Sequence, residues 1–401
     1  MTRRSGRSLI DVLCGVPCLV AALVPAPACA AEPVFPDATT HQRFVFPRDH
    51  GAHPDFRTEW WYVTGWLRTA DGEELGFQVT FFRSRTTTDD RNPSRFAPRQ
   101  LLFAHAALAD AKVGKLEHDQ RIARAGFGIA EASATDADVV LEGWRFARVP
   151  ATDERPGQDP SHDALHFTTR VDGDRFAFDL DLRANGPLLA QGADATRPGY
   201  SQKGPLARDA SRYYSVPQLA VSGTVARGAG SSRRTEKVTG TAWLDREWSS
   251  AYLDPQASGW DWVGLNLDDG GALMAFRMRD RQGAKLWAGG ARRLADGRVE
   301  RYRPDDVDFT TLRSWTSTRS RATWPVLQKI TIGATSPPGR SVTPLTVVVD
   351  PLMDDQELDS RGSTGTIYWE GAVRVRADDP AGRTIGKGYL ELTGYFAPLR
   401  F

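Results

Sequence analysis

The fold class is decided by a stretch of alternating side chains that reads TEWWYVTGWL at residues 58–67. The turn residues Ala70, Asp71 and Gly72 follow it, and a second apolar stretch, LGFQVTFFR, occupies residues 75–83. Aromatic and β-branched residues favour strands, and an Asp-Gly turn between two such runs is typical of a hairpin. The segment therefore predicts two antiparallel strands.

The same period-two pattern recurs along most of the chain. An Asp-Gly turn divides another alternating segment at residues 170–180, and one stretch, residues 112–125, has a helix-like composition that Gly114 weakens. Further strands are expected at residues 219–225, 240–248, 260–267, 272–279, 345–349, 365–377 and 385–395. We therefore predict an all-β protein.

The composition is that of a folded globular chain. Among 401 residues, 40% are hydrophobic and 25% are charged, and the formal net charge is +1. A chain of this size can bury a substantial core. Its balanced charge offers no basic field for phosphates, so we expect no nucleic-acid partner.

Two halves of the sequence resemble each other. The motif WWYVTG at residues 60–65 is echoed by WDWVG at 260–264, and each is followed by an Asp-Gly turn. Two β-barrels or sandwiches in tandem would explain the repeat, although unrelated hairpins can also look alike. A polar, turn-rich segment at residues 249–258 predicts a boundary between domains at 31–250 and 251–401.

The N-terminus is expected to be a targeting segment rather than part of the fold. Arg3, Arg4 and Arg7 precede an apolar stretch at residues 13–24, and Ala-Cys-Ala at 28–30 resembles a cleavage site. This order predicts a signal peptide over residues 1–30 and export to the periplasm or beyond. A helix that stays attached is the alternative.

Cysteine usage depends on that cleavage. Cys14, Cys18 and Cys29 all lie within residues 1–30, so a cleaved chain would hold no disulfide and no cysteine-based metal site. Cys29 could instead carry a lipid, which would make the protein a lipoprotein.

The segment WLDREW at residues 243–248 is the strongest candidate for chemistry. On a strand, Trp243, Asp245 and Glu247 share one face. Carboxyls that face an apolar barrel have raised pKa values and can donate a proton near neutral pH. The alternative is a structural ion pair with Arg246 or another arginine as the counter-ion.

A second candidate region surrounds the first strand. Alternation places Glu59 and Trp61 on one face, which could line a ligand-binding barrel or belong to its core. The preceding loop holds His50 and His53, a spacing that occurs in metal sites, but hydrogen bonds to Asp49 or Glu59 are the simpler interpretation. The sequence contains no nucleophile elbow, P-loop, dinucleotide fingerprint or zinc-protease helix. We expect no metal and no cofactor.

Several motifs together resemble the AttH/CrtC family, secreted lipocalin-like proteins that include carotenoid 1,2-hydratase. They cover nearly the whole chain after residue 30: FPRDHGAHP at 46–54, EWWYVTG at 59–65, FAH at 103–105, YYS at 213–215, WLDREW at 243–248 and GWDW at 259–262. The resemblance implies two tandem lipocalin-like barrels. It also implies an apolar lipid or polyene ligand, which we expect inside the N-terminal barrel near His50, Glu59, Trp61 and His105.

The resemblance further implies cofactor-independent addition of water to a double bond. Asp245 matches the family's acid, with Trp243 and Tyr214 facing the developing cation and Glu247 orienting the water. The strand at residues 213–217 departs from the hydratases because it has no histidine. Members of the AttH type resemble the chain more closely. Some are described as secreted hydrolases or as accessories of lipoprotein-type ABC exporters, so a non-catalytic lipid carrier that contacts transporter components is the alternative.

Overall fold

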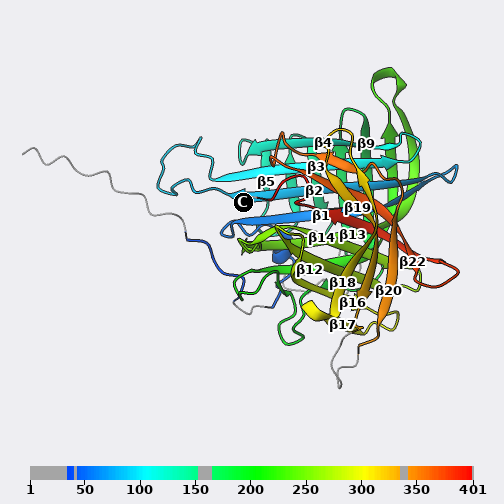
Figure 1. Ribbon diagram of the computed structural model, residues 1–401. Coiled ribbons are helices and arrows are strands. Elements are labelled where there is room, and N and C mark those ends of the chain that lie inside the picture. The colour runs from blue at the N-terminus through cyan, green and yellow to red at the C-terminus, as the bar shows by residue number, and fades with distance from the viewer. Residues whose placement is uncertain (1–33, 40–42, 152–164, 335–341, 400–401) are drawn as a thin grey trace, which may run out of the picture. The chain divides into compact units, whose positions relative to one another are not determined.

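The strands form two antiparallel sheets that follow one another along the chain (Figure 1). The computed structural model describes residues 34–39, 43–151, 165–334 and 342–399. The expected signal peptide and the three cysteines lie outside these residues. The regular strands bear out the all-β prediction and the lipocalin-like, barrel-type architecture.

The first sheet contains the strands up to residue 251, in the order β4-β3-β2-β1-β13-β12-β9-β8-β7-β6-β5. Its members are β1 (Thr58–Thr69), β2 (Glu74–Arg85), β3 (Gln100–Asp110), β4 (Lys115–Arg124), β5 (Ala130–Ala132), β6 (Asp138–Leu141), β7 (Trp144–Arg148), β8 (His166–Asp172), β9 (Phe176–Ala184), β12 (Ala210–Arg227) and β13 (Arg234–Ala251), with β10 (Leu189–Ala190) and β11 (Tyr200–Gln202) also paired to β12.

The second sheet begins at residue 257 and has the order β17-β16-β15-β14-β23-β22-β20-β19-β18. Its members are β14 (Ala257–Leu267), β15 (Ala272–Asp280), β16 (Lys285–Arg293), β17 (Val299–Tyr302), β18 (Val307–Thr316), β19 (Thr323–Ile332), β20 (Leu345–Pro351), β22 (Ile367–Ala377) and β23 (Thr384–Leu392), with β21 (Glu357–Asp359) paired to β22. The first sheet thus ends, and the second begins, within the polar segment at residues 249–258.

The described helices are three short 3-10 turns, at Arg48–His50, Gly230–Ser232 and Pro304–Asp306. No described helix combines the length and the hydrophobicity that crossing a bilayer requires. The helix-like composition of residues 112–125 does not produce a helix. Gly114, at φ 76°, ends a tight turn, and β4 then pairs with β3 along its whole length. Tertiary pairing overrides the weak local preference.

The predicted hairpins form, as β1–β2 and β8–β9. β1 pairs with β2 on one side, so that Trp61 lies opposite Phe81, and with β13 on the other. In the second sheet β14 pairs with β15 and with β23, which repeats the arrangement of the first. Because β1 and β14 are central strands, both of their faces are covered.

The inner face of the first sheet is filled by side chains. Trp61, Val63, Phe77 and Leu244 belong to one large buried cluster there. A packed interior of this kind disfavours a ligand inside the N-terminal barrel, where the sequence predicts one. The cavity described below lies between the two sheets instead.

The opposite face of the first sheet packs against the second sheet. Trp66 donates its indole N–H to the carbonyl of Gly388 at 3.0 Å, and the rings of Tyr62 and Trp262 meet edge to face at 5.3 Å between centroids. Gly76 permits this approach, because an added Cβ would lie 2.6 Å from the Cβ of Ala372. Residues 33–401 form one compact unit.

Candidate functional site

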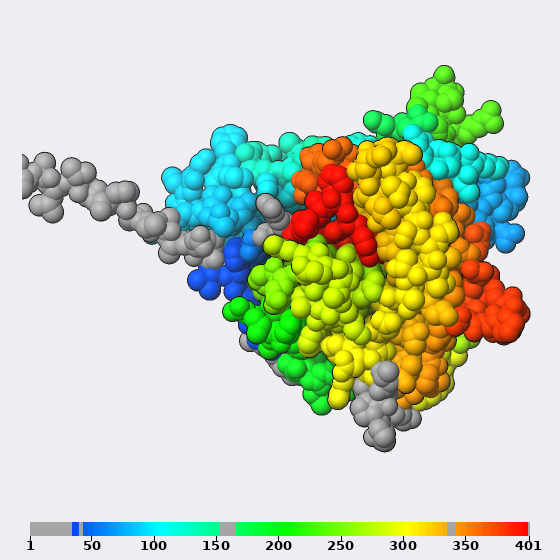
Figure 2. Space-filling view, in the orientation of Figure 1, coloured from blue at the N-terminus to red at the C-terminus, as the bar shows by residue number. Residues whose placement is uncertain are grey.

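A cavity of about 600 Å³ lies between the two sheets. This volume falls in the range of sites for drug-sized ligands. Figure 2 shows that the C-terminal segment (red), which covers part of the cavity, lies against the yellow-green start of the second sheet. Much of the wall is aromatic or carboxylic: Trp60, Tyr62, Phe82, Phe103, Tyr252, Trp260, Trp262, Phe276, Tyr368, Asp245, Glu247, Glu370 and Glu391, together with His105 and Lys203.

Asp245 faces this cavity from the middle of β13. Its Oδ1 accepts hydrogen bonds from the Ser215 hydroxyl at 2.5 Å and the Trp243 indole at 2.7 Å, and its Oδ2 accepts one from the Tyr213 hydroxyl. Burial raises its pKa to about 7, against the effect of these three donors and with help from the charge of Glu247. Asp245 can therefore hold a proton near neutral pH.

Arg246 does not pair with Asp245. Alternation turns the Arg246 guanidinium to the inner face, where it bonds Glu59, while Asp245 and Glu247 face the cavity. Glu247 instead has Lys203 as its cation, at 3.0 Å, and accepts a hydrogen bond from Ser211. The alternative of an Asp245–Arg246 ion pair is thereby excluded.

The chain from Asp245 continues into the second sheet. The Tyr213 hydroxyl, which donates to Asp245, accepts a hydrogen bond from the Trp262 indole at 3.1 Å. Trp262 belongs to β14, and its ring also lines the cavity. Residues of both sheets thus fix the position of the acid.

A second pair of carboxyls comes from the second sheet. Glu370 on β22 lies directly opposite Glu391 on β23, and both line the cavity. Burial raises the pKa of Glu391 to about 7, and the charges of Asp245 and Glu247 add to the effect. Burial and the charge of Glu391 raise the pKa of Glu370 well above its usual value.

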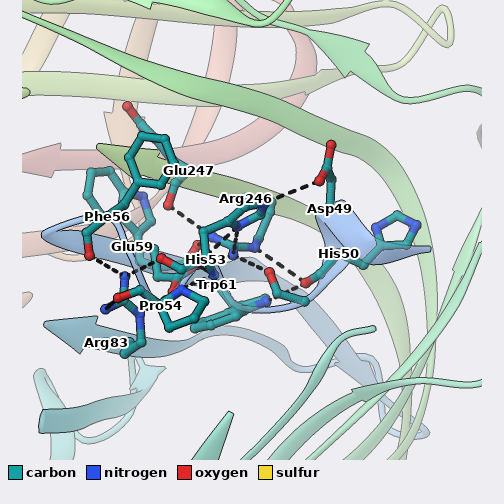
Figure 3. Close-up of polar contacts among 12 residues, drawn as sticks. Asp49, His50, His53, Pro54, Phe56, Glu59, Trp61, Arg83, Arg246 and Glu247 are labelled. Carbon is teal, nitrogen blue, oxygen red and sulfur yellow. Dashed lines mark hydrogen bonds and ion pairs between the residues drawn. The ribbon is translucent and has the colours of Figure 1, made fainter. Parts of the chain in front are cut away.

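The inner face of the first sheet carries a different polar group (Figure 3). Glu59 is fully buried and bonds both Arg83 and Arg246, and its two oxygens also accept the backbone N–H of His53 at 2.9 Å. Burial alone would raise the pKa of Glu59, but Arg246 and Arg83 lower it well below its usual value. This carboxyl is permanently charged and is suited to holding the loop at residues 46–54 in place.

His50, Trp61 and Tyr214 also lie on that inner face. His50 Nδ1 is 2.7 Å from the Tyr214 hydroxyl, and the Trp61 indole donates to the carbonyl of His50 at 2.8 Å. Burial, aided by Arg148 and Arg246, lowers the pKa of His50 to about 3, so the ring is neutral. The structure places these residues, with Glu59, away from the cavity.

His105 does line the cavity, from β3. Its ring bonds the Tyr368 hydroxyl and the Ser363 hydroxyl, each at 2.8 Å, which connects the first sheet to the second. Burial lowers its pKa to about 3, and it therefore acts as a neutral hydrogen-bonding group.

The structure brings Asp245, Glu247 and His105 together around one cavity, and Trp243 lies behind Asp245 as its hydrogen-bond donor. In the loop at residues 46–54, His53 stacks on Trp248 at 3.8 Å between ring centroids and contacts the carboxylates of Asp49 and Glu59. Among the described residues, no group of three or more His, Asp or Glu side chains is arranged to hold a metal ion.

Sequence reasoning missed Glu370, Glu391, Tyr62 and Lys203. Glu391 has no clear signal in the sequence, because the pairing of β23 with β14 and β22 is what brings it to the cavity. Glu370 and Lys203 carry no local signal, because only the pairing of β22 with β23 and the course of the loop after β11 bring them to the cavity.

Comparisons with known proteins agree with this architecture. A structure of a candidate AttH protein from Nitrosomonas europaea is 46% identical, with a TM-score of 0.76, and the match covers 90% of this chain and 100% of that one. Kievitone hydratase from Nectria haematococca shares the fold at 14% identity and a TM-score of 0.61, covering 90% of this chain and 97% of its own. CghA does so at 14% and 0.54, covering 92% and 96%.

No protein of curated function matches the chain by sequence. The family model described as AttH-like matches residues 37–395. This range includes both sheets and all the cavity-lining residues named above. The chain is therefore a member of the AttH-like family.

Proposed function

We propose that the protein is a cofactor-independent hydro-lyase that adds water to a carbon–carbon double bond of an apolar lipid or isoprenoid ligand. The ligand would occupy the cavity between the sheets. Asp245 would be the proton donor. The observation that carries the proposal is a buried carboxyl in an aromatic cavity wall whose three partners are all neutral donors.

The proposed reaction needs a carboxylic acid near neutral pH. Burial holds the pKa of Asp245 at about 7, so a large fraction carries a proton. A general acid is most effective when its pKa lies close to the working pH. Kievitone hydratase has the same fold, and its name is consistent with this class of reaction, although 14% identity carries no residue roles.

The steps balance without a further reagent. The double bond takes the proton of Asp245, which forms a C–H bond and leaves a carboxylate and a carbocation. A water molecule, oriented by Glu247, adds to the carbocation and returns one proton to Asp245. The faces of Trp262 and Tyr62 would stabilise the intermediate positive charge.

This arrangement changes two of the roles expected from the sequence. Trp243 acts as a positioning residue, because its indole N–H holds Oδ1 of Asp245. Tyr214 bonds His50 on the inner face, and Tyr62 and Trp262 take its place beside the ligand.

The test uses an acyclic polyene with a terminal double bond and water labelled with heavy oxygen. The intact protein should give a product heavier by one labelled water, detected by mass spectrometry. Asp245→Asn should lower the rate by about 10²–10⁴-fold, because the amide cannot donate a proton usefully. The exposed Glu131→Gln is the matched control and should leave the rate unchanged.

Binding and acidity provide two further readouts. Asp245→Asn should still bind the polyene, as measured by quenching of tryptophan fluorescence, because the aromatic wall is intact. The rate of the intact protein should fall above about pH 7 as Asp245 loses its proton. Full activity in Asp245→Asn would overturn the assignment.

A non-catalytic carrier is the second candidate, and one observation favours it. Three donors on one carboxyl are also what a purely structural Asp245 would need. A carrier would bind the polyene without turnover and would be recovered with a lipid in organic extracts. Co-purification with ABC transporter components would then support the accessory role.

We also propose that the protein is exported and that residues 1–30 are removed. The order of charged, apolar and small residues supports this. The mature protein should begin near Ala31, and its melting temperature should not respond to a reductant, because Cys14, Cys18 and Cys29 are lost. An N-terminus at Met1 would contradict export.

A further inference from the structure

Glu370 and Glu391 form an unusual pair. They occupy directly opposed positions on the adjacent strands β22 and β23, and Glu370 is 1% exposed. Like charges at such positions repel each other, and a buried carboxylate without a cation is costly. A Glu–Glu pair in a sheet that is otherwise well packed must therefore either hold protons or face a compensating cation.

The protein supplies little compensation. Among the described residues that line the cavity, Lys203 is the one permanently cationic side chain, and it bonds Glu247 rather than either of these glutamates. The Lys203 ammonium also lies over the rings of Tyr213 and Phe276, at 4.6 and 4.3 Å from their centroids. For Glu391, the neutral indole N–H of Trp260 is the donor, at 3.0 Å.

Two polar atoms beside the pair are incompletely satisfied. The Tyr62 hydroxyl and Oε1 of Glu370 are buried without a hydrogen bond of good geometry within the described part of the chain, although the Tyr62 and Tyr368 hydroxyls lie near enough to oppose the rise in the pKa of Glu370. Both residues line the cavity, and Tyr62 is 6% exposed. Buried polar groups are normally satisfied, so these atoms indicate that a ligand group belongs between them.

The remaining wall around this space is aromatic. Trp60, Trp260 and Trp262 line the cavity together with Tyr62. Aromatic faces with adjacent carboxylates are the combination that recognises organic ammonium groups. A metal ion is a poor fit, because no described group of three metal-ligating side chains is present.

We propose that Glu370 and Glu391, with the surrounding aromatic rings, form a subsite for an organic cation. Its ligand is an amphiphile with an apolar chain and a protonated or quaternary nitrogen. The inference goes beyond the proposed hydration and holds whether or not the ligand is turned over, because it concerns only charge recognition.

Proton release should accompany binding. Without a ligand, Glu370 and Glu391 retain protons near neutral pH, and a bound cation favours their charged forms. Affinity for the cation should therefore rise as pH increases through about 7. The ionisable groups that act on the pair from the surrounding elements are Tyr62 (β1), Asp245 and Glu247 (β13), Lys203 (the loop after β11) and Tyr368 (β22).

The experiment compares three ten-carbon probes below their micelle concentrations: decyltrimethylammonium, decanol and decanoate. Calorimetry in two buffers of different ionisation enthalpy gives both affinity and proton exchange. We expect the ammonium probe to bind at least about tenfold more tightly than decanoate at pH 8, since 1.4 kcal/mol corresponds to a factor of ten. It should release protons, whereas decanol should not.

Variants locate the charge. Glu370→Gln and Glu391→Gln should each weaken binding of the ammonium probe by about tenfold and reduce proton release, while binding of decanol stays the same. The exposed Asp71→Asn is the control and should change neither. Equal affinity for the three probes, or a preference for decanoate, in the intact protein would overturn the proposal, even if a variant failed to fold. Because no turnover is measured, this outcome is independent of the hydration test.

Discussion

Glu59 and Asp245 lie on paired neighbouring strands of one sheet and are equally hidden from water, at 0% and 2% exposure. On the inner face, Glu59 has two arginine partners, and its pKa is depressed despite its burial. On the cavity face, Asp245 has three neutral donors, and burial raises its pKa to about 7. Partners, rather than depth, decide whether a buried carboxyl is a salt-bridge anchor or an acid.

The second sheet repeats this division. Asp261 on β14 is fully buried and bonds Arg277 and Arg279, while Glu391 on the adjacent strand β23 faces the cavity without a cation of its own. The two sheets differ in the residue that lies opposite the cavity-facing carboxyl on the next strand. The residue beside Asp245 is Ser215, whereas the residue beside Glu391 is Glu370. The first sheet thus surrounds Asp245 with hydrogen-bond donors, whereas the second sheet places the carboxyls of Glu370 and Glu391 side by side.

The largest effect should come from breaking the anchor. Glu59→Gln would leave Arg83 and Arg246 buried without a counter-charge, and we expect a loss of about 3–5 kcal/mol in the free energy of unfolding. Urea denaturation measures it. The exposed Glu131→Gln should stay within about 0.5 kcal/mol of the parent. A loss in Glu59→Gln as small as that of the control would remove the anchor role.

The protonation of Asp245 should make the free energy of unfolding depend on pH. Asp245 has a raised pKa in the folded state, so its proton stabilises the fold at low pH, and this contribution is lost as pH rises through about 7. Asp245→Asn has no such proton to lose. Its unfolding free energy, relative to the parent, should therefore increase by about 2–3 kcal/mol between pH 5 and 7.

Chemical denaturation at several pH values gives that difference directly. Subtracting the variant from the parent cancels the opposing contributions of the buried His50 and His105, whose pKa values are lowered to about 3. A flat difference, or one that decreases with pH, would mean that Asp245 is charged in the folded state.

Removing one hydrogen-bond donor from Asp245 should have a smaller effect, which is a further rise in the pKa of that carboxyl. Tyr213→Phe deletes the hydroxyl that donates to Oδ2 of Asp245, so the pKa of Asp245 should rise further, by roughly one unit. The pH at which the Asp245→Asn difference levels off should move upward accordingly. Tyr302→Phe, which breaks a bond to Glu300 in the second sheet, should leave that pH unchanged.

The smallest effect is expected where a carboxylate is exposed. Asp296 bonds Arg298 in the turn before β17, and water screens that pair. Asp296→Asn should leave the melting temperature at the parent's value. A clear decrease in the melting temperature would indicate that burial and ion-pair partners alone do not decide how much a carboxylate contributes to stability.

The strands were predictable because alternation and turn residues specify them locally. The shared face of Trp243, Asp245 and Glu247 followed from the same periodicity. Which face lines the cavity was not predictable, because β1 and β13 bury both faces and only the packing of the second sheet distinguishes them. Glu370 was missed for a related reason, because its role depends on Glu391, which lies opposite it on the neighbouring strand.

The hydrogen bonds from Trp262 through Tyr213 to Asp245 have an evolutionary consequence. The Tyr213 hydroxyl that donates to Asp245 is itself held by an indole of the other sheet, so a change at any one of these three positions alters the surroundings of the other two. The two halves of the chain are therefore not free to diverge independently at these positions. Hybrids that join halves of distant relatives should therefore fold but lose a matched acid, unless residues 213, 245 and 262 are transferred as a set.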